Sequence, residues 1–244
     1  MIAQVKAELL KVRSTRTTLG LVLGMIALIL LFALLTGLLS KISGLSTTED
    51  QRTTLSLGSL AGIFSALAGV LLVTSEFRFG TIRPTFLFTP VRSRVLGAKL
   101  IAGLLAGLVF GVVGEGLGFA IGYLIIDARG ITFVLSGGEV ALLLLGTLAA
   151  TALWAALGVG FGAIVRNQVG AVIGLLAWGF IVDSLLFGLV PSVGRFTPTR
   201  AQDALIGLKT EHLLSPAAGG LVLVAWVVVL ALICLPLVAR RDVS

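Results

Sequence analysis

The chain alternates long apolar runs with short charged segments. Four runs contain no charged residue and end at Arg, Lys or Glu: 17–40, 53–75, 140–165 and 213–239. Two more, about 98–126 and 169–190, are equally apolar but each contains one acidic residue, Glu115 and Asp183 respectively. A helix of about 20 residues crosses the hydrocarbon layer of a bilayer with all its backbone groups paired. The pattern therefore predicts six transmembrane helices.

The amino-acid composition also indicates a protein that lies in a membrane. The 244 residues are 57% hydrophobic and only 12% charged, with a mean hydropathy of +1.14, whereas a soluble domain carries about 25% charged residues. We expect an all-α integral membrane protein that forms one transmembrane domain over 1–244. Soluble, disordered, collagen-like and disulfide-stapled classes are excluded, and the single Cys234 forms no intrachain disulfide.

Basic residues predict the orientation, because Lys and Arg near helix ends are retained in the cytoplasm. With the N-terminus inside, the cytoplasmic set is Lys6, Lys11, Arg13, Arg16, Arg78, Arg83, Arg92, Arg94, Lys99, Arg166, Arg240 and Arg241. The external set is half that size: Lys41, Arg52, Arg129, Arg195, Arg200 and Lys209. Both termini are expected in the cytoplasm. The net charge of +7 then points to anionic lipid headgroups and not to nucleic acid.

Residues 1–16 favour an amphipathic helix lying in the headgroup plane. Ile2, Val5, Leu9 and Val12 recur at helical spacing, and charged residues occupy the other faces. A purely topogenic basic tail is the alternative. A signal peptide is rejected, because the apolar run is too long and no small-x-small cleavage site follows it.

Two loops are longer than simple turns. Segment 76–97 mixes aromatic residues, arginines and prolines, and Pro84 and Pro90 break any single long helix there. Short helices at the membrane surface are expected. Segment 191–212 on the external side is either a surface helix or a segment that dips back into the bilayer.

Motifs for catalysis and nucleotide binding are missing from the sequence. No P-loop occurs, so the chain does not bind ATP through one of its own. The only histidine, His212, cannot supply a two-histidine metal or haem site. We expect no metal site, no cofactor held by this chain and no enzymatic activity.

Glycines follow one face of the third predicted span. Gly103, Gly107, Gly111, Gly118 and Gly122 recur at helical spacing. Small residues let helices in lipid approach closely, so this span is expected at the centre of the bundle. The ridge fits packing within one subunit and a dimer seam equally well.

The acids inside the predicted spans need an explanation, because an isolated carboxylate at mid-membrane costs several kcal/mol. Glu115 is expected on or near the glycine face, either in a translocation path or as a hydrogen-bonded structural acid. The same alternatives apply to Asp183, for which the structural role is favoured.

These features together resemble the membrane subunit of a bacterial ABC-2 type transporter. The most specific stretch is Ser75-Glu76-Phe77-Arg78-Phe79-Gly80-Thr81-Ile82, followed by Pro90, Arg94 and Lys99. The resemblance covers the whole chain. It implies a permease that dimerises with a second permease subunit in the plasma membrane, with separate ATP-binding subunits holding ATP and magnesium. It implies coupling helices in 76–97, and short re-entrant helices in 191–212.

The residues that the resemblance assigns to ATPase coupling are charged, aromatic or turn-forming. They are Glu76, Phe77, Arg78, Gly80, Thr81, Arg83 and Arg94, with Phe79 and Phe86 as further aromatic contacts. The family exports lipophilic or amphipathic compounds. Two other classes stay open: a stand-alone secondary carrier or channel that uses Glu115 and Asp183 as proton or cation sites, and a membrane scaffold.

Overall fold

The structure is a computed structural model that describes residues 1–39, 45–82, 84 and 91–240. Every regular element in these ranges is a helix. In chain order they are α1 (Ile2–Ser14), α2 (Arg16–Leu39), α3 (Thr48–Leu55), η2 (Ser56–Leu60), α4 (Ala61–Arg78), α6 (Arg92–Ala128), α7 (Gly137–Val165), α8 (Gln168–Ala177), η3 (Trp178–Val182), α9 (Asp183–Leu189), α10 (Pro191–Gly194), α11 (Pro198–Leu205) and α12 (Pro216–Arg240).

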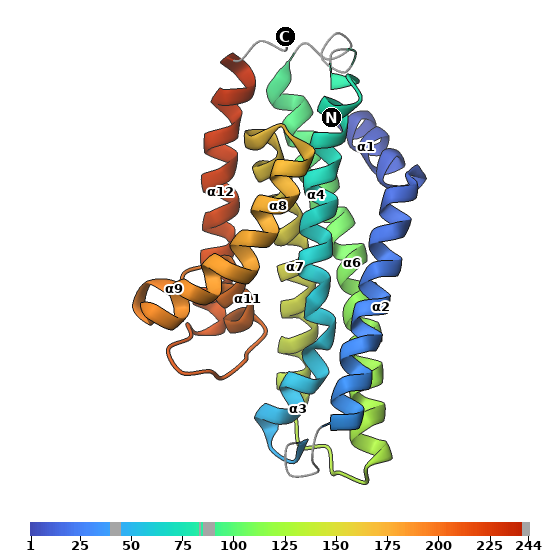
Figure 1. Ribbon diagram of the computed structural model, residues 1–244, viewed down its shortest axis with the longest axis vertical. Helices are drawn as coiled ribbons and strands as arrows, with labels where there is room; N and C mark the ends of the chain where they lie inside the picture. Colours follow the sequence, from blue (N-terminus) through green and yellow to red (C-terminus); the bar gives the residue numbers. More distant parts are fainter. Residues whose placement is uncertain (40–44, 83, 85–90, 241–244) are drawn as a thin grey trace.

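Six helical stretches in the described ranges are long and apolar enough to cross a membrane, which confirms the expected all-helical, six-span architecture at this level. They are Arg16–Leu39, Thr48–Arg78, Arg92–Ala128, Gly137–Val165, Gln168–Leu189 and Pro216–Cys234. The first residues of α1 and the end of α12 lie at the same end of the bundle, and α3 lies at the other (Figure 1). We call these the α1 end and the α3 end.

Two helices begin earlier than their apolar runs. The second starts at Thr48 instead of residue 53, because Thr47 caps it by accepting a hydrogen bond from the Asp50 backbone N–H at 3.2 Å. The third starts at Arg92 instead of residue 98. Segment 92–97, expected in the loop, is therefore helical. The sixth starts later, at Pro216, since proline fits the first turn of a helix.

The centre of the bundle consists of α4, α6 and α7. More than half of the residues in their apolar stretches are buried, against 17% for α2, 6% for the α8–α9 stretch and 17% for α12. Figure 1 shows α4 and α7 side by side, with α2 and α12 at opposite edges. The peripheral helices thus present long apolar faces outward, which suits lipid or another subunit.

Glycines allow the central helices to touch. A Cβ atom at Gly69 of α4 would collide with the carbonyl oxygen of Ala155 on α7, and one at Gly158 of α7 with that of Ala66 on α4. The five glycines of the predicted ridge on α6 lie in similar contacts. Gly103, Gly107 and Gly111 face α7, whereas Gly118 and Gly122 face η2 and the end of α3. All these contacts lie within the one chain.

Candidate functional site

Four charged side chains meet at the α1 end of the bundle. The Lys99 Nζ of α6 lies 2.8 Å from Glu8 of α1 and 2.8 Å from Glu76 of α4. The Lys11 Nζ of α1 lies 2.9 Å from Glu8 and 2.6 Å from Glu76. Each cation thus contacts both carboxylates, and the cluster is electrically neutral. We call Glu8, Lys11, Glu76 and Lys99 the charge cluster.

Three of the four side chains in the charge cluster are removed from solvent. Lys99 is 2% exposed, Glu76 4% and Glu8 5%. Lys99 also donates to the Leu72 carbonyl oxygen at 3.1 Å, which uses another of its three donors. Removing one member of such a buried group leaves an uncompensated charge, which typically costs about 3–5 kcal/mol. The cluster therefore fixes α1 against the ends of α4 and α6.

Apolar contacts support the same docking. Leu9 and Val12 of α1 pack against a core cluster that includes Leu72 and Leu96. The helical spacing of the apolar positions is as expected, and Leu9 and Val12 face the bundle. A single extended residue, Thr15, separates α1 from α2, so α1 turns across the end of the bundle (Figure 1).

Lys11 is the most accessible member of the charge cluster. Partial burial on its own would lower the pKa of this ammonium group, but hydrogen bonds and charges from Glu76 and Glu8 outweigh that effect and raise the pKa. Lys11 is therefore charged throughout the neutral pH range.

The residues assigned to ATPase coupling divide into two groups. Glu76 is buried and paired with Lys11 and Lys99 within the chain, so its carboxylate does not face a partner in this structure. Phe77 is half-buried, with the Arg166 guanidinium 5.5 Å from its ring centroid. Arg78, Gly80, Thr81 and Arg94 are exposed, as is Phe79. Arg83, Phe86 and Pro90 lie outside the described residues.

A turn follows the last residue of α4. Gly80 has a φ of +69°, which is favourable for glycine and costly for other residues. This turn leaves Phe79 71% exposed, with the Arg78 guanidinium 5.5 Å from its ring centroid. Arg78 also donates to the Gln168 side chain at 3.4 Å, which joins the end of α4 to the start of α8.

Glu115 lies where α6 touches η2. Its side chain is 2% exposed. The Thr147 side chain is its polar neighbour, but neither carboxyl oxygen has a partner with good hydrogen-bond geometry among the described residues. A Cβ at Gly58 of η2 would lie within 2.5 Å of Glu115 Oε2. Burial without a partner favours the neutral acid. The close contact between η2 and the Glu115 backbone and side chain favours a buried packing role.

Asp183 has a local structural role. It is fully buried, and its Oδ2 accepts a hydrogen bond from the Thr199 backbone N–H at 2.9 Å. Thr199 is in the first turn of α11, where the backbone N–H groups have no partner within the helix. Asp183 thus holds the start of α11 against α9, 16 residues earlier in the chain.

A second polar cluster closes the α3 end. Arg52, 3% exposed, forms an ion pair of 2.6 Å with Glu139 at the start of α7 and donates to the Gly207 carbonyl oxygen. Gln51 donates to Thr132 and accepts from the Val134 N–H. These contacts join α3, the α6–α7 connection and the segment after α11.

Sequence reasoning missed the charge cluster and the Arg52 site. Among the basic residues expected in the cytoplasm, Lys99 is the one that lies within a predicted span, 98–126. A lysine inside an apolar helix requires a carboxylate partner, and that requirement was the available signal. The identity of the partners was not readable, because Glu8 and Glu76 come from distant parts of the chain.

Two cavities adjoin near the middle of the molecule. The larger, 280 Å³, lies between η2, α4, α7, α8, α9 and α11. The smaller, 150 Å³, lies between α7, α8, α11 and α12. Among the described residues, no group of three or more His, Cys, Asp or Glu side chains could hold a metal ion.

A scan against protein-family models and a search of curated proteins give no match to this chain.

The charge cluster predicts a specific loss of stability. Replacing Lys99 by Met leaves two buried carboxylates with only Lys11 between them, so the free energy of unfolding should fall by about 3–5 kcal/mol. Thermal unfolding of the detergent-purified protein measures this. Arg94→Met, at an exposed position on the same helix, is the matched control. Equal melting temperatures for the two variants would show that the cluster does not support the fold.

The buried position of Glu115 predicts that two substitutions there differ in their effect on stability. Glu115→Gln keeps the size and polarity of the neutral acid, so the unfolding temperature should stay near that of the parent. Glu115→Lys buries an unpaired charge and should cost several kcal/mol and lower the folded yield. If Gln destabilised the protein as strongly as Lys, the neutral packing role would be wrong.

Proposed function

We propose that this chain is the permease subunit of an ATP-driven ABC transporter of the ABC-2 type. In this proposal the chain performs no catalysis. A separate ATP-binding subunit holds ATP and magnesium, and a second permease subunit completes the pathway. The cargo is a lipophilic or amphipathic compound that is exported across a bacterial plasma membrane.

The observation that carries the proposal is the docking of α1 by the charge cluster at the basic end of the bundle. A surface that receives force from a soluble partner must be rigid, and α1, α4 and α6 are held together there by ion pairs of 2.6–2.9 Å. Next to it, Arg78, Phe79 and Arg94 are exposed. Exposed aromatic and arginine side chains are enriched in protein interfaces.

The outer faces of the bundle are compatible with a second permease subunit. The apolar stretches of α2, of α8–α9 and of α12 are buried over only 17%, 6% and 17% of their residues. Lipid and a second subunit both suit such surfaces.

A stand-alone carrier is the second candidate function. It is favoured by the unpaired carboxyl group of Glu115, because buried acids of this kind mark proton pathways in many carriers. It is weakened by Asp183, because its carboxylate already accepts a hydrogen bond from the Thr199 backbone N–H at the start of α11.

The coupling surface can be tested with surface variants. Arg78→Glu and Phe79→Ala should each lower co-purification of a co-expressed ATP-binding subunit about tenfold or more, because they remove exposed charge and apolar area without touching the charge cluster. Leu38→Ala is the control, since Leu38 is 71% exposed near the α3 end. Unchanged co-purification in both variants would contradict the coupling assignment.

The orientation can be tested by cysteine labelling. In a Cys234→Ser background, which has no other cysteine, Ser192→Cys in α10 should react with an impermeant maleimide on intact cells. Ser93→Cys, exposed at the start of α6, should react only after the cells are permeabilised. Labelling of position 93 in intact cells would refute cytoplasmic termini.

A further inference from the structure

The two adjoining cavities have different chemical character. The 280 Å³ cavity has polar groups in its wall, from Ser59, Ser184, Thr199, Gln202 and Asp203. The 150 Å³ cavity is lined by apolar and aromatic side chains. Trp154 and Leu175 belong to both walls, so the two cavities are neighbours on either side of these residues. Their volumes together fall within the range of sites for drug-sized molecules.

All three tryptophans of the chain line the smaller cavity. The rings of Trp178 and Trp226 meet edge to face, with centroids 6.0 Å apart. Trp226 is fixed further, because its Nε1 donates to the Phe196 carbonyl oxygen at 2.8 Å. Aromatic side chains favour contact with a flat apolar group.

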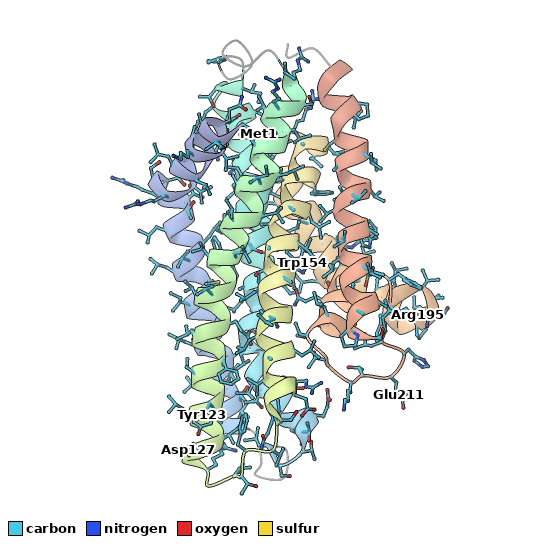
Figure 2. All side chains as sticks on the ribbon, turned by 180° about the vertical axis from the view of Figure 1, so that it is seen from behind. Met1, Tyr123, Asp127, Trp154, Arg195 and Glu211 are labelled. Carbon is cyan, nitrogen blue, oxygen red and sulfur yellow. The ribbon has the colours of Figure 1, made fainter. Side chains whose placement is uncertain are left out.

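Trp154 carries an unused hydrogen-bond donor at the junction. Its side chain is 6% exposed, and its Nε1 has no hydrogen-bond partner among the described residues. Figure 2 marks Trp154 midway along the bundle, far from either end. A buried N–H without an acceptor typically costs about 1–3 kcal/mol. A ligand that offers an acceptor there would recover this energy.

The backbone of the α8–α9 stretch is irregular beside the same space. Residues Trp178–Val182 form a turn of π-helix, a rare conformation that is frequent at functional sites. Gly179 of this turn lies in the wall of the larger cavity, and a Cβ there would meet nothing within 4 Å. The turn therefore borders open space.

We infer that the two cavities form one binding site for an amphipathic molecule, with a flat apolar body among the three tryptophans and a hydrogen-bonding polar end beside Gln202 and Ser184. An acceptor atom near the junction bonds the Trp154 N–H. The polar end is uncharged, because Asp203 is already paired with Arg200 at 2.9 Å. The identification of this molecule as the exported compound rests on the proposed function.

Binding at this site can be measured by energy transfer from the three tryptophans. Dansylamide is a suitable probe: it has a flat naphthalene body and an uncharged sulfonamide end with acceptors and donors, and it absorbs where tryptophan emits. Titrated into the purified chain in detergent, without nucleotide or partner subunit, it should show saturable energy transfer from tryptophan. Gly179→Leu should abolish the saturable component, because the new side chain fills the larger cavity.

Two further variants complete the test. Gly20→Leu adds the same side chain where a Cβ also meets nothing within 4 Å, but on α2, and should leave Kd within about twofold. Trp154→Phe keeps the ring and removes the N–H, so Kd should rise about tenfold, while the other two tryptophans still report.

Equal transfer in the parent and Gly179→Leu would overturn the site, since the probe would then only partition into the micelle. An unchanged Kd in Trp154→Phe would overturn the role of its N–H. The proposed function is judged separately, by ATP-driven transport with the co-expressed ATP-binding subunit. Saturable binding without such transport would leave the site standing and remove the transporter assignment.

Discussion

The arrangement of the α1 end depends on one constraint, the burial of Lys99. An ammonium group in the apolar start of α6 is unstable unless carboxylates surround it. Glu76 at the end of α4 supplies one, and Glu8 of α1 supplies the other. Lys11 then balances the second negative charge. Helix α1 contributes one acid and one base, Glu8 and Lys11, so its docking surrounds Lys99 with a second carboxylate and leaves the net charge of the cluster at zero.

Small residues determine how closely the central helices of the bundle approach one another. At Gly69 and Gly158 the backbones of α4 and α7 touch, and the glycines of α6 bring that helix against α7 and η2. Close packing of this kind leaves no room for adjustment within the centre. The peripheral helices pack less tightly and keep apolar faces outward. The molecule thus combines a rigid central layer with exposed flanks.

Much of this architecture is readable from sequence, because it follows from local patterns. The apolar runs identify all six spans, and the glycine spacing identifies the face of α6 that enters helix contacts. Helix ends were less readable. The stretch from α3 begins before its apolar run because Thr47 caps it, and α6 begins before its run because Val95 and Leu96 of the added turns are buried.

The candidate sites were harder to predict, because their members meet only in three dimensions. Glu8 and Lys99 are 91 positions apart, and nothing local links Asp183 to the start of α11. The π-helical turn at Trp178–Val182 has no sequence signature that hydropathy detects. The three tryptophans come from three different helices, so their shared cavity is visible only after the helices pack.

Helix α4 connects the two sites that matter to the proposed transporter. Near its start, Ile63 borders the larger cavity; near its end, Glu76 belongs to the charge cluster. An α-helix of this length spans about 27 Å, and the contacts at Gly69 and Gly158 oppose its bending because they are backbone contacts. A displacement at Arg78 and Phe79 would therefore move α4 together with α7 and change their position relative to α8 and α9 in the cavity wall. Bound cargo and the coupling surface would then bias the same element, which is the physical requirement for linkage between two distant sites.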